Sequence, residues 1–340
     1  MRLALVGWGG DSGVGRELID AYRHLPVQAL FIMENRHKPT RKDLLPAGVP
    51  ACLASAGDLE GQMERFLDEH KPDTVLTWEL PGSWNFPGIW ARRGISWKNV
   101  VHWDWFAGQH MNVWRMADLV APNRICAQEL REKYSLPSTY LPVPVDTERL
   151  AWKERRRAEL FISVYGFGGF HDRRSIPELV AAWKAMAKPP PLIIRAQVPP
   201  GELERTGRPN SIRVEVGNLP EPADLWETGD IAVQPSRYEG LGLSMLEAQA
   251  RGVPVIAVNA PPMNEIACEL LVGVERVETL SVMGKPLLSH VPSSDSIRKV
   301  VESLEGRDLA PLSRAARHRV ETQFSWRVLL QPWLDFLSKR

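Results

Sequence analysis

The sequence predicts an α/β protein of two domains, each a parallel sheet covered by helices, facing each other across a cleft. Its 340 residues match two domains of about 150 residues each. Short apolar segments alternate with amphipathic helical segments along the chain, which is the pattern of buried parallel strands joined by helices. The alternation stops once, near residue 142, and then restarts, which predicts the division into domains.

The first half holds apolar segments expected to be strands and amphipathic segments expected to be helices. The strands are expected at residues 2–7, 27–33, 73–78, 99–103 and 118–122, and the helices at 15–25, 59–70 and 124–134. The strand segments are continuous Val, Leu and Ile runs, so we expect both faces of the sheet to be buried.

The second half repeats this pattern after a connection over residues 141–160, which carries two prolines and then a charged run. Strands are expected at 160–166, 191–196, 212–217, 230–235 and 253–258, and helices at 176–186, 223–228, 243–252, 296–304, 311–323 and 325–337. We therefore expect one domain over 1–150, a second over 151–325 and a closing helix over 326–340. A ligand is expected in the cleft, at the carboxyl ends of the strands.

Composition and charge exclude several classes of protein. The net charge is +1, and both halves are balanced, so neither half is a basic module for nucleic acid or anionic membrane. Cys52, Cys126 and Cys268 are widely separated, which argues against a disulfide framework or a metal knuckle and fits a reducing compartment. The N-terminal segment is expected to be a strand and not a signal peptide, and no apolar stretch is long enough for stable membrane insertion. We expect a cytoplasmic protein.

Residues 230–266 carry the strongest functional signal: a strand, a glycine-broken loop, a helix and a strand. Gly240 and Gly242 allow the backbone to approach a ligand closely. The free N–H groups at Leu241, Gly242 and Leu243 begin the helix and are expected to bind phosphate. Glu239 precedes this turn, and Glu247 follows it within the helix. A carboxylate accepts two hydroxyl groups, so the pair suits a ligand with two sugars joined by a diphosphate.

The segment PSRYEGLGLSMLEAQARGVPVIA, with seven residues between its two glutamates, resembles the signature of glycosyltransferase family 4. These are retaining enzymes with the GT-B fold of two Rossmann-like domains, the first on the acceptor side and the second binding the nucleotide sugar. The resemblance implies that Glu239 contacts the transferred sugar, Glu247 the ribose and the turn between them the diphosphate. It also implies retention of configuration without a protein nucleophile. The alternative is an ordinary strand–loop–helix with solvated acids.

Other segments resemble the same family less closely. NVVHWDW resembles its strand that ends in a histidine, which implies that the imidazole of His102 or the nearby backbone positions the sugar or the acceptor. SGVGRELIDAYRHL resembles its glycine-rich first loop and places Gly13 where a backbone N–H approaches the donor phosphate. Residues 117–150 resemble the end of the first domain, and FSWRVLLQPWLDFL resembles the closing helix that crosses back to it. A purely structural role is the alternative for His102 and for Gly13.

One segment departs from the family pattern. The family begins its second domain with an Arg and, five residues later, a Lys, which both bind the diphosphate. In VYGFGGFHDRRSIPELVAAW, Arg174 occupies the Lys position, but Gly169 occupies the Arg position. Arg173 and His171 are the candidate replacements for the missing cation. The chain has no Asp-x-Asp pair, so we expect metal-independent binding of the diphosphate and no cofactor besides the nucleotide-sugar substrate.

The acceptor is expected on the first domain, where seven of the 13 tryptophans fall between residues 78 and 114. Trp103, Trp105 or a neighbouring tryptophan could stack on a sugar or a base, although at least half of these rings should be core. The loop over residues 34–43 is basic and could contact an anionic acceptor, or it could be a solvated loop. Transfer to a modified base of a nucleic acid is an alternative function.

Three further functions stay open from the sequence. The first is an NAD-type oxidoreductase, because a dinucleotide-binding unit resembles the segment RLALVGWGGDSGVGRELI followed by Glu34. In this segment, however, Ser12 stands where the third glycine of that unit is expected. A binding protein that kept the fold but lost catalysis would explain the missing cation. A nucleotide-sugar epimerase is the third.

Overall fold

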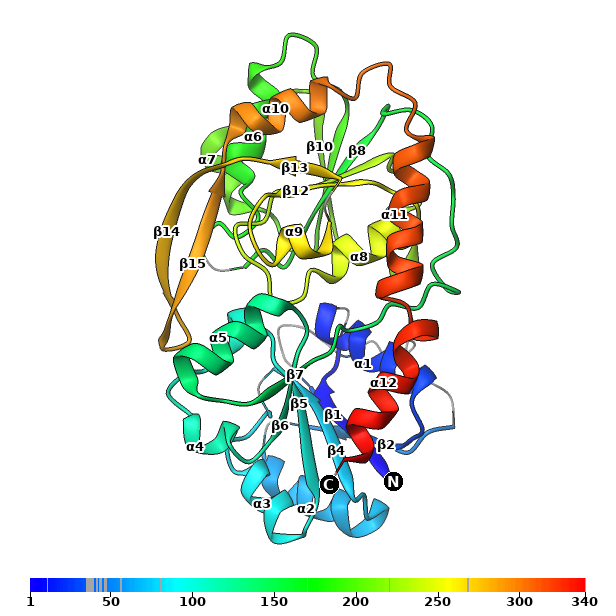
Figure 1. Cartoon of the computed structure of the whole chain (residues 1–340), viewed down its shortest axis with the longest axis vertical. Coiled ribbons are helices and arrows are strands. Elements are labelled where there is room, and N and C mark those ends of the chain that lie inside the picture. Colours follow the sequence, from blue (N-terminus) through cyan, green and yellow to red (C-terminus); the bar gives the residue numbers. More distant parts are fainter. Residues whose placement is uncertain are drawn as a thin grey trace. The chain divides into compact units, whose positions relative to one another are not determined.

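The computed structural model describes residues 1–340 except 11, 35–39, 41, 43–44, 46–47, 56, 80, 170, 220, 268 and 340, together with the side chains of 204, 222 and 223 (Figure 1). The chain divides into two compact units. Unit 1 comprises Met1–Pro144, Val282–Lys285 and Trp326–Arg340, and unit 2 comprises Val145–Ser281 and Pro286–Ser325. Most of the basic loop 34–43 lies outside the described residues, so the expected contact of this loop with an anionic acceptor stays a prediction. Cys268 also lies outside the described residues.

Within the described part of the chain, unit 1 is built on a seven-stranded parallel sheet of order β3-β2-β1-β4-β5-β6-β7. Its strands are β1 Leu3–Trp8, β2 Val27–Met33, β3 Ala51–Ala54, β4 Thr74–Trp78, β5 Ser96–Val100, β6 Asp118–Ala121 and β7 Ser138–Tyr140. The strand order reverses between β1 and β4, and the carboxyl ends of these two strands are where open α/β sheets bind ligands.

The helices of unit 1 follow the strands, as the alternation predicts. They are α1 Gly13–His24, α2 Leu59–His70, α3 Phe86–Arg92, the 3-10 turn η2 Trp103–Trp105, α4 Met111–Trp114, α5 Arg124–Tyr134 and α12 Trp326–Ser338. Side-chain caps fix three of their starts: Ser12 accepts a hydrogen bond from the N–H of Gly15, Asp58 from Gly61 and Asn123 from Cys126. The sequence expectation extended β5 to residue 103, but the strand ends at Val100 because the chain turns into η2.

Buried polar contacts hold α12 within unit 1. The Lys98 ammonium, fully buried on β5, donates to the carboxylate of Asp118 and, at 2.6 Å, to the carbonyl of Lys339. The indole N–H of Trp333 donates to the carbonyl of Pro142 at 3.0 Å. Because a buried ammonium is costly without partners, these contacts tie the end of the chain to the sheet of unit 1.

Unit 2, as far as the structure describes it, is built on a six-stranded parallel sheet of order β10-β9-β8-β11-β12-β13. These strands are β8 Phe161–Gly166, β9 Leu192–Ala196, β10 Ile212–Val216, β11 Ile231–Gln234, β12 Val255–Val258 and β13 Leu270–Val272. The order reverses between β8 and β11, so unit 2 has the same kind of switch point as unit 1. The predicted α/β class with two parallel-sheet, Rossmann-like domains is confirmed.

The remaining elements of unit 2 are mostly helices: α6 Ile176–Ala185, α7 Gly201–Thr206, η3 Pro222–Trp226, α8 Leu243–Ala250, α9 Met263–Ile266, α10 Ser294–Glu302 and α11 Ala310–Gln323. The helix expected at 223–228 is only the 3-10 turn η3. The hairpin of β14 Val274–Val282 and β15 Lys285–Pro292 was not predicted, although its residues alternate in polarity and turn at Met283 and Gly284. In the described residues, no helix has both the length and the apolar character to cross a membrane.

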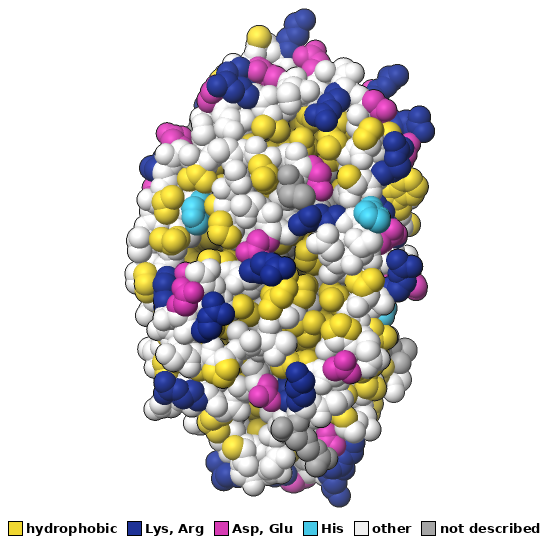
Figure 2. All heavy atoms as spheres, in the orientation of Figure 1, with side chains coloured by type: hydrophobic (Ala, Val, Ile, Leu, Met, Phe, Trp, Pro, Cys, Tyr) yellow, Lys and Arg dark blue, Asp and Glu magenta, His cyan; other side chains and the backbone are white. Residues whose placement is uncertain are grey.

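Charge is mixed over the visible surface. Figure 2 shows Lys and Arg interspersed with Asp and Glu on the face it draws, with no large area of one sign. This distribution agrees with the balanced composition of the two halves of the sequence.

Candidate active site

In unit 2, three of the predicted site residues lie together with Ser236 at the switch point of the sheet. Arg173 and Arg174 lie in the loop that follows β8, and Ser236 and Glu239 lie in the loop that follows β11. Strands β8 and β11 are paired neighbours in the sheet, and parallel strands end at the same edge. The fold therefore brings residues more than sixty positions apart in sequence to one point.

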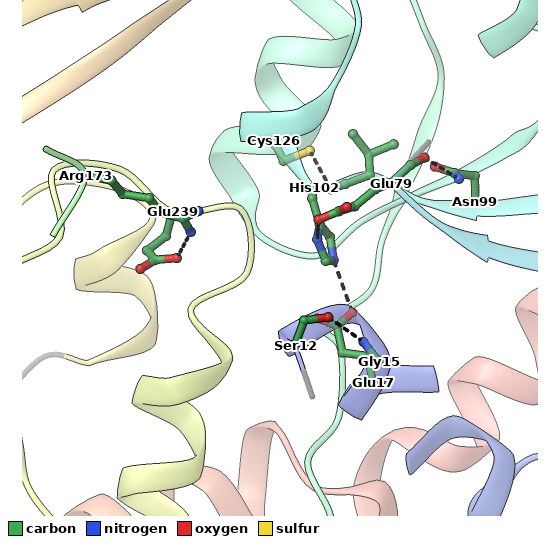
Figure 3. Close-up of polar contacts among 10 residues, drawn as sticks. Ser12, Gly15, Glu17, Glu79, Asn99, His102, Cys126, Arg173 and Glu239 are labelled. Atoms are coloured by element: carbon green, nitrogen blue, oxygen red, sulfur yellow. Dashed lines mark hydrogen bonds and ion pairs between the residues drawn. The ribbon is translucent and has the colours of Figure 1, made fainter. Parts of the chain in front are cut away.

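Glu239 forms the centre of this cluster and is held by two guanidinium groups. Arg173 donates to one carboxylate oxygen (Figure 3). Arg174 donates to the other carboxylate oxygen and also, at 2.9 Å, to the hydroxyl of Ser236. The Glu239 side chain is 3% exposed. Burial acts to raise the pKa of Glu239, but the two arginines lower it to about 2. The cluster is therefore a fixed carboxylate between two cations, with a positive excess of one charge.

The loop between β8 and α6 adopts an unusual backbone. Gly166, Gly168 and Gly169 have positive φ, and so do His171, Asp172 and Ser175, for which this conformation is strained. A Cβ at Gly169 would lie 2.8 Å from Cδ of Arg173, so a side chain there would displace that arginine. The φ of 145° at Gly169 and the closeness of Arg173 both favour glycine at this position.

This geometry locates the candidate replacements for the missing cation. Arg173 and Arg174 both contact Glu239, whereas His171 is exposed. Strain of this kind concentrates at functional sites, because the surrounding structure must hold the backbone in place. Arg173 thus lies beside Glu239, as Arg174 does, and its role as the replacement for the missing cation stays a prediction.

The turn from Glu239 into α8 has the form expected of an anion-binding helix start. Gly242 is the residue before the helix, with φ of 75°, and a Cβ there would lie 2.6 Å from Cδ1 of Ile266. Among the described residues, the backbone N–H groups of Leu241, Gly242 and Leu243 donate no hydrogen bond. Such N–H groups and the helix dipole favour a bound anion.

Glu247 lies in the second turn of α8 and is 8% exposed. The whole of α8 is buried, because the helix packs between β11, β12 and α11. The two predicted glutamates therefore both lie inside unit 2, Glu239 before the turn and Glu247 after it, and neither is a solvated surface acid.

Unit 1 has its own buried ionic cluster, formed by Glu17 of α1, Glu79 directly after β4 and His102 two residues after β5. Nδ1 of His102 lies 3.0 Å from Oε1 of Glu79, and its Nε2 lies 3.1 Å from Oε2 of Glu17 (Figure 3). Strands β1, β4 and β5 are consecutive in the sheet. The cluster therefore lies at the switch point of unit 1.

The charge state of His102 follows from these contacts. Burial alone would lower the pKa of His102, but the charges and hydrogen bonds of Glu17 and Glu79 raise it well above its ordinary value. Burial raises the pKa of Glu17, against the effect of His102. The raised pKa of His102 and the carboxylate at each of its nitrogens favour an imidazolium that donates to both glutamates.

Sequence reasoning found His102 but missed Glu17 and Glu79. Glu17 looks like an ordinary acid of an amphipathic helix, and nothing local reveals that it is buried. Glu79 could have been found, since a carboxylate directly after a buried strand lies at the ligand-binding edge of a parallel sheet. Gly13, predicted to approach the donor phosphate, is the first residue of α1, and its role stays a prediction.

The tryptophans of residues 78–114 are mostly core, as expected. Trp78, Trp90, Trp97, Trp103 and Trp114 are each at most 7% exposed. The proposed stacking of an acceptor on Trp103 is wrong, because this ring stacks on Phe106 with centroids 5.5 Å apart and lies 4.7 Å from the Lys285 ammonium. Trp105 is half-buried, and its contact with an acceptor stays a prediction.

Comparison with known proteins agrees with the fold and with the signature segment. Residues 212–275, which contain Glu239 and Glu247, match the family described as Glycosyl transferases group 1. No curated protein sequence matches the chain.

Several solved structures are similar over the full chain. HepE from Anabaena, in complex with UDP and glucose, is 13% identical with a TM-score of 0.74, over 98% of this chain and 99% of that one. A glycosyltransferase from Rickettsia africae is 14% identical with a TM-score of 0.72, over the whole of both chains. Sucrose-phosphate synthase from Thermosynechococcus elongatus is 14% identical with a TM-score of 0.69, over 98% of both.

At these identities the likeness shows the fold, which is the GT-B fold of glycosyltransferases. The matched segment contains the Glu239 turn and helix α8, the part of unit 2 at which the ionic cluster lies. Together, the matched segment and the shared fold support a glycosyltransferase.

Proposed function

We propose that this chain is a retaining glycosyltransferase that moves a sugar from a nucleotide diphosphate sugar to an acceptor, without a metal ion. The observation that carries the proposal is the cluster in unit 2, where Arg173 and Arg174 flank Glu239 beside the glycine turn that begins α8. HepE, a structural neighbour, binds UDP and glucose, which supports a nucleotide sugar as the donor.

Each group in the cluster has a part in this reaction. The two guanidiniums and the N–H groups before α8 would bind the diphosphate and stabilise its charge as the glycosidic bond breaks. Glu239 would accept hydrogen bonds from hydroxyls of the transferred sugar, and Glu247 from the ribose. In the absence of donor, Glu239 also holds both arginines in place, so their positions are set before the diphosphate arrives.

The geometry weighs against two of the alternatives raised by the sequence. Ser12, which interrupts the dinucleotide-binding pattern, caps α1 through the N–H of Gly15, and this weighs against an oxidoreductase. The binding-protein alternative was motivated by a missing cation, and the contact of Arg173 with Glu239 supports this arginine as the replacement. Retention of configuration and a cytoplasmic location are proposed from the family resemblance and from the cysteines.

Nucleotide binding tests the proposal directly. A thermal-shift panel of UDP, GDP, ADP and dTDP, followed by the matching nucleotide sugars, should stabilise the protein with at least one nucleotide. Glu247→Ala should weaken binding of that nucleotide by about 10- to 100-fold, since a buried charged hydrogen bond contributes roughly 1.5–3 kcal/mol. Exposed Glu69→Ala, in unit 1, is the control. A protein that binds none of the four nucleotides contradicts the proposal.

A further inference from the structure

We propose that Glu79 is a binding residue for the acceptor, and that its second carboxylate oxygen accepts a hydrogen bond from an acceptor hydroxyl group. The acceptor would therefore present a neutral, hydroxyl-bearing group, such as an unmodified sugar, to unit 1. This inference rests on the proposed glycosyltransferase function and adds the chemical class of the second substrate.

The position of Glu79 is the first support. Glu79 follows Trp78, the last residue of β4, and β4 pairs with β1 at the switch point of the sheet. In parallel α/β sheets, ligands bind at this point, outside the carboxyl ends of the strands. Glu79 therefore lies where a substrate of unit 1 is expected on topology alone.

The backbone of Glu79 is the second support. Its φ of 58° is a left-handed conformation, which costs energy for any residue with a Cβ. Glycine would adopt it without strain, yet a glutamate stands here. Strained residues persist where the surroundings hold them and the side chain has a task.

A buried network holds this strained backbone. The N–H of Glu79 donates to the carbonyl of Val100 at 3.0 Å, and its carbonyl accepts from the side-chain amide of Asn99 at 3.0 Å. The same amide nitrogen lies 2.6 Å from the hydroxyl of Thr77, which also accepts from the indole of Trp97 at 2.8 Å. The backbone of Glu79 is thus fixed by contacts with β5 and by its position after β4.

The two oxygens of the Glu79 carboxylate differ. Oε1 accepts a hydrogen bond from His102, whereas no described residue donates to Oε2. The side chain of Glu79 is 15% exposed, compared with 2% for Glu17 on the other side of the imidazole. Glu79 is therefore the carboxylate of this cluster that a ligand can reach, and it has one oxygen available.

Charge selects the kind of group that Glu79 can bind. Two carboxylates enclose the single imidazolium of His102, and Arg16 acts on the far carboxylate, Glu17. A hydroxyl group donates a hydrogen bond to a carboxylate, whereas a phosphate or a second carboxylate is repelled by it. Both nitrogens of His102 are engaged by the two glutamates. His102 therefore orients Glu79, and Glu79 is the residue that contacts the acceptor substrate.

The test is a glycan array probed with the full chain, carrying neutral, phosphorylated and carboxylated glycans. The wild type should bind neutral glycans, and Glu79→Gln should reduce this binding at least 10-fold, because the amide loses the charge that strengthens a hydrogen bond. Glu79→Gly, which removes the carboxylate and relieves the left-handed strain, should show the same loss. Exposed Glu69→Gln in unit 1 should bind as the wild type does.

Nucleotide binding by the same variants separates this inference from the proposed function. Both Glu79 variants should keep the wild-type affinity for the stabilising nucleotide, since the arginine cluster lies in unit 2. A wild type that binds only phosphorylated or carboxylated glycans, or no glycan, overturns the inference. Retained glycan binding by Glu79→Gln also overturns it. A wild type that binds no nucleotide contradicts the function instead, whatever the array shows.

Discussion

The two units carry opposite ionic clusters at the same topological position. In unit 1, one imidazolium, His102, lies between the carboxylates of Glu17 and Glu79. In unit 2, one carboxylate, Glu239, lies between the guanidiniums of Arg173 and Arg174. Each cluster lies where the strand order of its sheet reverses.

If both proposals hold, this contrast explains how one architecture serves two kinds of ligand. In a parallel sheet of this order, the loops that follow the strands lie at the same edge, whatever residues the loops contain. Under the two proposals above, the positive excess in unit 2 favours a diphosphate, and the accessible carboxylate of Glu79 in unit 1 favours a hydroxyl donor. The predictions below test this difference, from the largest expected effect to the smallest.

Removing both cations of unit 2 should have the largest effect. Arg173→Ala combined with Arg174→Ala should reduce nucleoside diphosphate affinity by at least about 100-fold, because two charge-assisted hydrogen bonds contribute roughly 1.5–3 kcal/mol each. Isothermal titration with the stabilising nucleotide measures the change. The matched control is Arg156→Ala combined with Arg157→Ala, an exposed adjacent pair in the same unit. Equal affinities for the two double variants would remove the cluster from the donor site.

The pH dependence of stability should reveal the cluster in unit 2 at low pH. The pKa of Glu239 is lowered from 4.5 to about 2, so its stabilising contribution is present above pH 4.5 and is lost as pH falls toward 2. The contribution should be on the order of 3 kcal/mol. Denaturant unfolding of wild type and Glu239→Gln measures it: their difference should be constant above pH 4.5 and shrink below. A difference that does not change with acid contradicts the ion-pair assignment.

The cluster in unit 1 should respond in the opposite direction. The pKa of His102 is raised, so its stabilising contribution is present below its ordinary pKa of 6.5 and is lost as pH rises through the raised value. His102→Asn should therefore cost about 1–3 kcal/mol at neutral pH, with the difference from wild type shrinking in alkali. Nitrogen NMR shifts of the imidazole give an independent measurement. A neutral ring at pH 7 would contradict the assignment of an imidazolium.

The smallest effect is expected at His171, the other candidate for the missing cation. This residue is exposed, in contrast to Arg173, which contacts Glu239. His171→Ala should change nucleotide affinity by less than about 0.5 kcal/mol, as surface substitutions usually do. A loss as large as that of Arg173→Ala would show that the histidine moves into the site when the donor binds.

Local signals in the sequence account for the elements that were predicted well. The helices at 59–70 and 124–134 match α2 and α5 to the residue, because Asp58 and Asn123 are visible caps before an amphipathic run. The turn before α8 was predicted from its glycines and the strand and helix around it.

Features that depend on distant residues could not be predicted in the same way. Glu17 and His102 are 85 positions apart and meet only because β1, β4 and β5 are consecutive in the sheet. Trp103 seemed available for stacking, but its burial depends on Phe106 and on Lys285, far along the chain. The site was therefore predictable where one continuous segment forms it, and not where the sheet order assembles it.

The uneven distribution of tryptophan has a spectroscopic consequence. Ten of the 13 tryptophans belong to unit 1, and only Trp152, Trp183 and Trp226 belong to unit 2. Intrinsic fluorescence will therefore report mainly the melting of unit 1, whereas circular dichroism will follow both units. If the two units melt at different temperatures, the two signals will separate, and each nucleotide or glycan can be assigned to the unit whose transition it shifts.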